Sequence, residues 1–195
     1  MSKLYSTGQF LCRTFLRLFF RVKVIGKENI PENEGVLLCC NHIHELDPPF
    51  LGAFIKRQTR FMAKSELFEA PILKSLLPKL GAFPIRRGMS DRQALRTGLK
   101  LLSEGELIGV FPEGTRSKSG KLGEGLAGVG FFALRSNAYI VPSAIIGNYK
   151  LFSQITLVYG KPIDMDKLRE EKVSAEEATN KIMAGIQKLL DEYDK

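Results

Sequence analysis

The strongest constraint on the fold of this 195-residue chain is a regular alternation of short apolar runs with longer segments of helical periodicity. Short runs of branched and aromatic residues bounded by turn residues predict strands. Alternation of strands and helices is typical of an α/β protein in which helices flank a sheet with parallel strands. The sequence therefore predicts a single α/β domain with a mixed, largely parallel central sheet. Strands are expected over residues 35–40, 60–63, 82–85, 107–111, 138–146 and 155–159.

Turn and capping residues mark the helices expected between these strands. Ser90 with Gln93, and Ser174 with Glu177, have the spacing of a capping box at a helix N-terminus. Pro84 lacks a backbone N–H and therefore places its strand at an edge of the sheet. Helices are expected over residues 49–57, 71–80, the segment between Ser90 and Gly105, 129–135 and the C-terminal segment after Ser174.

The composition is that of a globular protein with an excess of basic residues. The chain is 44% hydrophobic and 26% charged, which excludes a disordered chain, and its formal net charge is +8. This charge predicts an anionic partner: nucleic acid, an anionic membrane or a phosphorylated substrate. The three cysteines, of which Cys39 and Cys40 are adjacent, form neither a disulfide framework nor a zinc-binding spacing. Such cysteine usage favours a reducing, cytosolic compartment.

Residues 1–24 are basic and amphipathic. Arg13, Arg17 and Arg21 interrupt every apolar run well short of about 18 residues, so this segment cannot span a bilayer. On a helix the arginines share a narrow face opposite a wide, aromatic-rich apolar face, a pattern typical of a helix in the headgroup region of an anionic membrane. The alternative is a helix packed on the protein's own core with solvated arginines. The apolar face would consist of Leu4, Leu11, Phe15, Leu16, Leu18, Phe19 and Val22.

The apolar run at residues 35–40 is followed by a histidine and a carboxylate five positions apart, His42 and Asp47. The pair would lie at the C-terminal end of a buried strand, where open α/β sheets usually bind ligands. A histidine can act as a base near neutral pH, and an aspartate on its ring can stabilise the imidazolium that forms. A structural alternative also fits, because Asp47 before Pro48 has the pattern of a helix N-cap and His42 can be a core residue.

Hydrogen-bond donors follow two further predicted strands. Arg86 stands at the end of the strand over 82–85, and Thr115 and Arg116 follow the strand over 107–111. Guanidinium and hydroxyl groups at strand ends suit a phosphate oxyanion. Solvated basic residues with no ligand are the alternative.

Four stretches, in this order, resemble the glycerolipid acyltransferase family, which includes bacterial 1-acyl-glycerol-3-phosphate acyltransferases. Asn41-His42 with Asp47 is similar to the H-x4-D motif of that family. The other three stretches are residues 81–86, 111–117 and 141–145, and looser similarity continues through residue 163. One departure is Leu-Gly-Glu-Gly at residues 122–125, where many relatives carry a Phe- and Lys-rich stretch.

This resemblance implies acyl transfer from a thioester, either acyl-CoA or acyl-carrier protein, to a hydroxyl of lysophosphatidic acid, which gives phosphatidic acid. It implies that His42 is the general base and that Asp47 orients it, with no covalent acyl-enzyme, metal or cofactor. His44, the competing histidine, has no role in the family's register and is interpreted as a neighbour at the pocket rim. The residues expected at the acceptor phosphate are Arg86, Glu113, Gly114, Thr115, Arg116 and, as a lesser candidate, Lys64.

The resemblance also predicts where the protein acts. We expect residues 25–195 to be the acyltransferase domain, held at the cytoplasmic face of the cell membrane by residues 1–24 as a peripheral or monotopic protein. One alternative is an enzyme that acylates glycerol 3-phosphate or another lysolipid. A second is a non-catalytic basic module for anionic membranes or nucleic acid. Nucleic acid is disfavoured because basic and aromatic residues interleave in the N-terminal segment rather than on a β surface.

Overall fold

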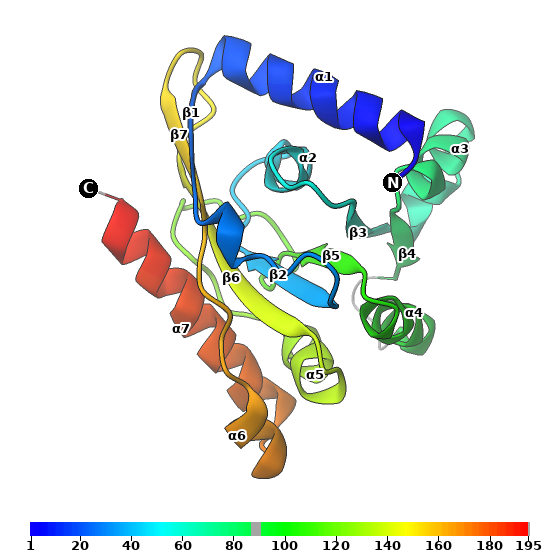
Figure 1. Cartoon of the computed structure of the whole chain (residues 1–195), viewed down its shortest axis with the longest axis vertical. Coiled ribbons are helices and arrows are strands. Elements are labelled where there is room, and N and C mark those ends of the chain that lie inside the picture. The colour runs from blue at the N-terminus through cyan, green and yellow to red at the C-terminus, as the bar shows by residue number, and fades with distance from the viewer. Residues whose placement is uncertain (87–90, 195) are drawn as a thin grey trace.

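The sheet is built around β2 (Val36–Cys40), a strand whose five residues are all buried. The computed structural model of the chain describes residues 1–86 and 91–194. Within these residues six further strands join β2: β1 (Arg21–Ile25), β3 (Thr59–Lys64), β4 (Phe83–Ile85), β5 (Leu107–Val110), β6 (Tyr139–Gly147) and β7 (Gln154–Tyr159). The order across the sheet is β1-β7-β6-β2-β5-β3-β4 (Figure 1).

The neighbouring strands are parallel except for β6 and β7, which form an antiparallel pair. The predicted α/β class with a mixed, largely parallel sheet is therefore confirmed. β4 carries Pro84 and lies at the edge of the sheet, as its missing N–H requires. Because β2, β5 and β6 are parallel, their C-terminal ends lie at one edge of the sheet, and the loops that follow them meet there.

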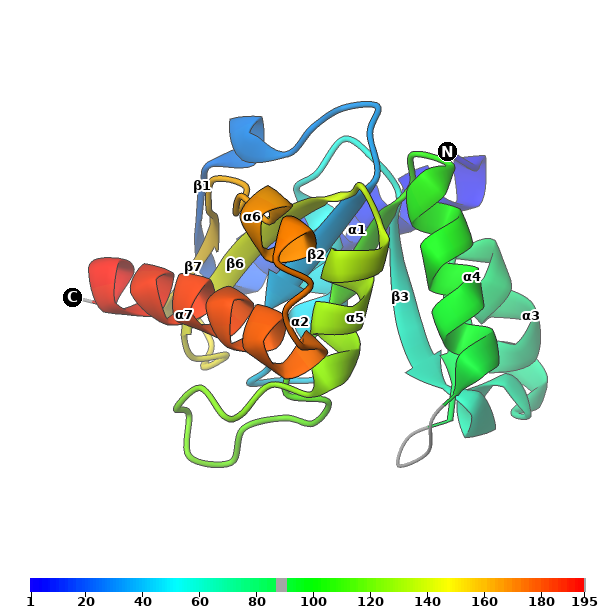
Figure 2. The same ribbon diagram turned by 90° about the horizontal axis from the view of Figure 1, so that it is seen from below.

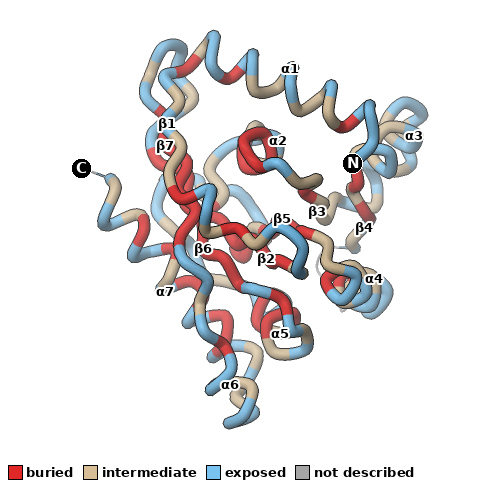
Figure 3. Tube along the Cα trace, in the orientation of Figure 1, coloured by how far each residue is buried: buried red, intermediate tan, exposed pale blue. Residues whose placement is uncertain are grey.

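Helices cover both faces of the sheet (Figures 1 and 2). Alternate side chains of β2 divide between two core clusters: Leu38 packs with α1 and α2, and Leu37 packs with α4, α5 and α7. Figure 3 shows the buried residues concentrated on the central strands and on the inner sides of these helices. The helices are α1 (Lys3–Phe19), α2 (Asp47–Ala53), α3 (Pro71–Lys79), α4 (Arg92–Ser103), α5 (Ala127–Arg135), α6 (Asp166–Glu170) and α7 (Ala175–Tyr193), with 3-10 turns η1 (Lys27–Asn29) and η2 (Ser65–Phe68).

The helix caps agree only in part with the prediction. Ser174 caps α7 as expected, because its hydroxyl accepts a hydrogen bond from Glu177 N at 3.1 Å. For α4 the cap is Asp91, whose carboxylate accepts from the backbone N–H of Gln93 and Ala94. Ser90, which was predicted to cap this helix, lies outside the described residues. Asp91 fulfils the same need, since the first N–H groups of a helix lack partners within it.

The expectation of a helix through residue 24 is wrong, because α1 ends at Phe19 and residues 21–25 form the strand β1. The segment Arg-Val-Lys-Val-Ile alternates exposed basic residues with half-buried branched ones, and this period of two suits a strand. β1 pairs in parallel with β7, with Arg21 opposite Gln154. These residues therefore belong to the sheet.

α1 packs on the domain along one side only. Tyr5 and Leu16 are buried, and Gln9 Nε2 donates to the carbonyl oxygens of Gly52 and Ile55 at 2.9 and 2.7 Å. A second apolar side of the helix is exposed; its members are Leu4, Leu11, Phe15 and Leu18. In the part of the chain that the structure describes, no helix combines the length and the apolar character that crossing a membrane requires.

Candidate active site

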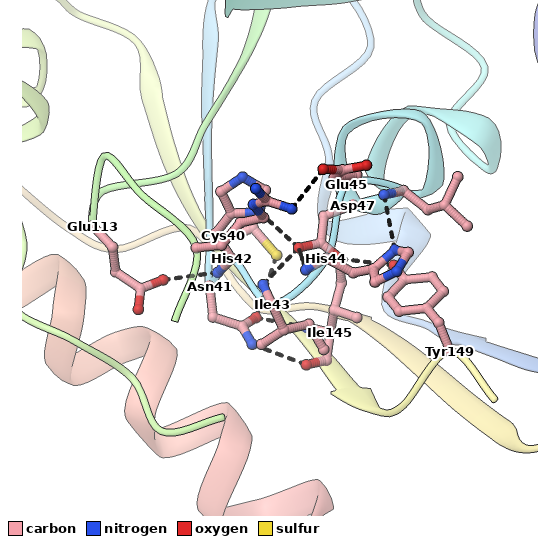
Figure 4. A network of polar contacts seen from close by, with 12 residues as sticks. Cys40, Asn41, His42, Ile43, His44, Glu45, Asp47, Glu113, Ile145 and Tyr149 are labelled. Carbon is pink, nitrogen blue, oxygen red and sulfur yellow. Dashed lines mark hydrogen bonds and ion pairs between the residues drawn. The ribbon is translucent and has the colours of Figure 1, made fainter. Parts of the chain in front are cut away.

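The chain leaves β2 through a buried asparagine that ties two strands together. The side-chain amide of Asn41 donates to Ile145 O at 2.9 Å, and its oxygen accepts from Ile145 N at 2.8 Å. These two bonds continue the pairing of β2 with β6 beyond the last strand residue. Asn41 thus fixes the direction in which His42 and the following loop leave the sheet (Figure 4).

The loop closes on the carboxylate of Asp47, which is fully buried. His42 Nδ1 lies 2.7 Å from Asp47 Oδ2, and the backbone N–H groups of Ile43 and His44 donate to the same oxygen at 2.6 and 2.7 Å. The five-residue spacing thus lets residues 42–47 form a single turn around the Asp47 carboxylate. With this carboxylate as acceptor, Nδ1 is the nitrogen that donates, so in the neutral imidazole Nε2 carries the lone pair.

The structural alternative for Asp47, a helix N-cap, is wrong. Asp47 is the first residue of α2, Leu46 occupies the cap position, and no side chain caps the helix. Asp47 Oδ2 instead caps the loop that precedes α2, because it accepts from two N–H groups of that loop. The prediction that Asp47 contacts the ring of His42 is confirmed.

Tyr149 completes the carboxylate's hydrogen bonds from a distant part of the chain. Its hydroxyl donates to Asp47 Oδ1 at 2.7 Å, and its ring stacks on that of His44 with centroids 4.3 Å apart. Burial raises the pKa of Tyr149, and the negative charge of Asp47 raises this pKa further, so the phenol keeps its proton and can only donate to the carboxylate. Sequence reasoning missed Tyr149, because it lies in the turn between β6 and β7 outside every recognised stretch.

Glu113 binds the backbone of the histidine from the loop after β5. Its Oε2 accepts from His42 N at 2.8 Å, and its Oε1 accepts from Gly123 N at 2.8 Å. The same loop returns to the histidine at Ser117, whose N–H donates to His42 O at 2.7 Å. Glu113 is buried and both its oxygens are engaged, which suits positioning of His42 rather than contact with a phosphate.

The ring of His42 is held between this network and an aromatic residue. Phe111 stacks on it with centroids 4.1 Å apart and planes inclined by 22°. The His42 side chain retains an exposed fraction of 12%, so the packed ring is not completely sealed from solvent. A packed but partly accessible histidine can exchange a proton with a molecule bound beside it.

A cavity of about 800 Å³ adjoins the site, with Phe111 in its lining. Its interior is largely apolar, and its lining includes Met62, Ile85, Leu95, Phe131 and Phe132. Four of the six residues expected at the phosphate also line it: Arg86, Glu113, Gly114 and Thr115. An apolar cavity with a guanidinium on its lining suits a molecule that joins an acyl chain to an anionic group.

The other two basic candidates lie away from this lining. Arg116 Nη1 forms an exposed ion pair with Glu45 Oε1 at 2.7 Å. Lys64 is exposed at the end of β3, opposite Ile85 in the pairing of β3 with β4, and therefore beside the strand that carries Arg86. The structure thus brings Arg86 and the 113–115 loop together, but it does not bring Arg116 to the same cavity lining.

The thiol and carboxylate groups near the site offer no further nucleophile or metal centre. Cys39 and Cys40 are fully buried, and burial raises the pKa of both thiols. Among the described residues, no three histidine, cysteine, aspartate or glutamate side chains are grouped so that they can share a metal ion.

The chain is similar to known acyltransferases in sequence and in fold. The acyltransferase family model matches residues 21–146. The 1-acyl-sn-glycerol-3-phosphate acyltransferase of Bacillus subtilis is 33% identical over 192 residues, which cover 92% of this chain and 95% of that protein. The protein of the same name from Borreliella burgdorferi is 30% identical over 134 residues, 68% of this chain and 54% of that protein.

A solved structure agrees with the fold. The crystal structure of the 1-acyl-sn-glycerophosphate (LPA) acyltransferase from Thermotoga maritima matches with a TM-score of 0.75 at 24% identity, over 98% of this chain and 78% of that one. The matched family region begins at β1 and contains His42, Asp47, Arg86 and Glu113. By its sequence, and with a histidine–aspartate pair at the edge of a largely parallel sheet, this chain belongs to the acyltransferase family.

Proposed function

We propose that the protein transfers a fatty acyl group from an acyl thioester to the sn-2 hydroxyl of lysophosphatidic acid, with His42 as general base. The observation that carries this proposal is the 2.7 Å contact of His42 Nδ1 with the buried Asp47, which leaves Nε2 as the ring nitrogen available to act as a base. The donor is acyl-CoA or acyl-carrier protein. The names of the relatives support lysophosphatidic acid as the acceptor.

The reaction needs a base because an alcohol is a weak nucleophile at neutral pH. His42 Nε2 takes the hydroxyl proton as the alcohol oxygen attacks the thioester carbonyl carbon. The carbon–sulfur bond then breaks, and His42 returns the proton to the leaving thiolate, which gives an ester and a free thiol. Asp47 stabilises the imidazolium formed between these two steps. No covalent acyl-enzyme is required, because the thioester is already activated.

Four further residues hold the base in place. Tyr149 and the N–H groups of Ile43 and His44 fix the orientation of the Asp47 carboxylate, so this group meets the ring in one geometry. Glu113 holds the backbone of His42 itself. Such rigid placement is a large part of catalysis when two substrates must meet at one atom.

Recognition of the acceptor phosphate is assigned to Arg86, with Gly114 and Thr115 on the same cavity lining and Lys64 on the adjacent strand. Arg116 is a second donor, because its exposed ion pair with Glu45 is of a kind that contributes little to stability, so a phosphate can replace the carboxylate. The apolar part of the cavity accommodates an acyl chain. Arg86→Ala is expected to raise the KM for the acceptor more than it lowers kcat, because it removes binding rather than the base.

The exposed side of α1 supports attachment to the cytoplasmic face of a membrane. Leu4, Leu11 and Leu18 recur at a spacing of seven and lie on one side of the helix, with Phe15 beside them. The buried residues Tyr5 and Leu16 occupy the neighbouring side. The helix thus packs on its own domain with one apolar side and offers a second one to lipid.

The reaction is tested by free-thiol release from a long-chain acyl-CoA, with and without lysophosphatidic acid. Acceptor-dependent release is expected in the wild type and should fall at least about a hundredfold in His42→Ala. His44→Ala is the matched control, because it keeps the backbone N–H that donates to Asp47 and removes only a ring that stacks on Tyr149, so most of the activity should remain. If thiol release depends neither on the acceptor nor on His42, the protein does not catalyse the proposed acyl transfer. Faster release with glycerol 3-phosphate or another lysolipid would reassign the acceptor.

A further inference from the structure

The turn between β6 and β7 exposes two large apolar residues in succession. Leu151 and Phe152 each have an exposed fraction of 65%. Phe152 also has a φ of +61°, a left-handed backbone conformation that bulky residues rarely adopt. Glycine or asparagine would form this turn with less strain. Turn formation therefore does not account for the residues found here.

This turn is held firmly against the end of α1. Phe152 N donates to Phe19 O at 2.7 Å, and Arg21 N donates to Ser153 O at 2.9 Å. The Ser153 hydroxyl adds bonds within the turn, because it donates to Asn148 O and Lys150 O, each at 2.6 Å. The two apolar side chains thus project from a fixed turn.

The turn lies at the same edge of the sheet as the catalytic histidine. β6 is parallel to β2, so the residues after both strands meet at that edge, and Tyr149 of the turn reaches Asp47. Leu18, in the last turn of α1, is exposed one residue before Phe19, which holds Phe152. Figure 1 shows the turn beside the end of α1, where β1 begins.

The surroundings of the turn are basic. Lys150, Arg17 and Arg21 are exposed and, among the described residues, none of the three forms an ion pair. The sequence has no acidic residue from 1 to 27 or from 148 to 153. Exposed apolar side chains beside exposed basic residues match the interior and the headgroups of an anionic lipid layer. A second copy of the chain is a poorer occupant, because a symmetric contact would bring like charges together.

We propose that Leu151 and Phe152 insert into an anionic lipid surface and form a second lipid contact beside α1. This inference rests on the proposed function, in that the acceptor is a lipid. The inserted turn places the lipid layer at the edge of the sheet where His42 lies, so a lysolipid can reach the base without crossing open water. Lys150, Arg17 and Arg21 contact the phosphate groups around the inserted side chains.

The test is sedimentation of the full chain with vesicles of equal parts phosphatidylglycerol and phosphatidylcholine. The variant is Leu151→Ser with Phe152→Asn, since asparagine tolerates the left-handed backbone and the turn should still form. The matched control is Tyr139→Ser, which removes an exposed aromatic residue at the opposite end of β6. Vesicle partition of the double variant should fall at least about tenfold, whereas the control should match the wild type.

Activity in detergent, measured in parallel, separates this inference from the proposed function. The double variant should keep wild-type thiol release with detergent-dispersed lysophosphatidic acid, because the lipid surface is no longer needed. Equal vesicle partition of double variant and wild type overturns the lipid contact, whatever the activity. A wild-type dimer that the double substitution converts into a monomer, with vesicle partition unchanged, would also overturn it and assign the turn to self-association.

Discussion

The Tyr149 hydroxyl donates to Asp47 Oδ1 at 2.7 Å although the two residues are 102 positions apart in the chain. The other oxygen of the carboxylate is occupied by His42 and by two N–H groups of its own loop. The ring of His42 is thus oriented by a carboxylate that is itself held by a residue of the turn between β6 and β7.

Tyr149→Phe removes this hydroxyl and keeps the ring that packs on His44. We expect kcat to fall about tenfold with little change in KM, because Asp47 is less well oriented while the substrate sites are intact. Stability should fall by about 1 kcal/mol in urea unfolding. Tyr193→Phe, on α7, is the control and should change neither quantity. An unchanged kcat in Tyr149→Phe would contradict the proposal that this hydroxyl orients Asp47 for catalysis.

His42→Ala and Asp47→Ala are both expected to impair acyl transfer, but they should differ in stability. Asp47→Ala leaves two loop N–H groups and the Tyr149 hydroxyl without their buried acceptor, and we expect a loss of about 3–5 kcal/mol. His42→Ala leaves the carboxylate with its other three donors, so the loss should be only about 1–2 kcal/mol. Urea unfolding measures both. Equal losses would mean that the carboxylate does not organise the loop as its hydrogen bonds indicate.

Burial of Cys39 and Cys40 predicts a loss of stability in alkali. Burial raises the pKa of both thiols in the folded protein above their usual value of 9.0. The unfolded chain therefore releases these protons first, so stability is complete below about pH 9 and falls as the pH rises, by up to about 1.4 kcal/mol per pH unit for each thiol. The free energy of unfolding should be measured from pH 8 to pH 11. Cys39→Ala with Cys40→Ala should flatten this dependence, whereas Cys12→Ala should change it less.

Lipid attachment through α1 is tested by substitution on its exposed side. Leu4→Gln with Leu11→Gln should weaken partition into phosphatidylglycerol vesicles about tenfold, since both apolar side chains would lose their contact with lipid. Phe10→Gln is the matched control, because Phe10 is exposed on the polar side of the same helix. Deletion of residues 1–24 is less informative, since it removes most of β1 as well as α1. Undiminished partition of the double variant would leave α1 as a purely structural helix.

The parts of the fold that sequence reasoning predicted are those with a local pattern. The run before Asn41 is a buried strand because every residue in it is apolar, and the His42–Asp47 spacing is a feature of one turn. The α7 cap at Ser174 is likewise local. Each of these depends on residues within a few positions of one another, and a single sequence displays such patterns directly.

The features that were missed depend on distant residues or on competing patterns. Tyr149 carries no signal of its own, because its partner lies across the sheet. Glu113 can hold His42 because the loops after the neighbouring strands β5 and β2 lie close together. The spacing of the two residues along the chain gives no sign of this contact. For β1, the alternation from Arg21 to Ile25 was present, but it continued the amphipathic pattern of α1, and the pairing with β7 decided between them.

The pairing of β1 with β7 also orders events during synthesis. Arg21 lies opposite Gln154, so 133 further residues must be made before β1 has a neighbour. At about 5–20 residues per second, the ribosome needs roughly 7 to 27 seconds for this stretch. In the later part of that interval α1 has left the ribosome while the strand after it has no neighbouring strand to pair with. Both apolar sides of α1 are therefore exposed at this stage, because the part of the domain that later buries one of them has not yet been made.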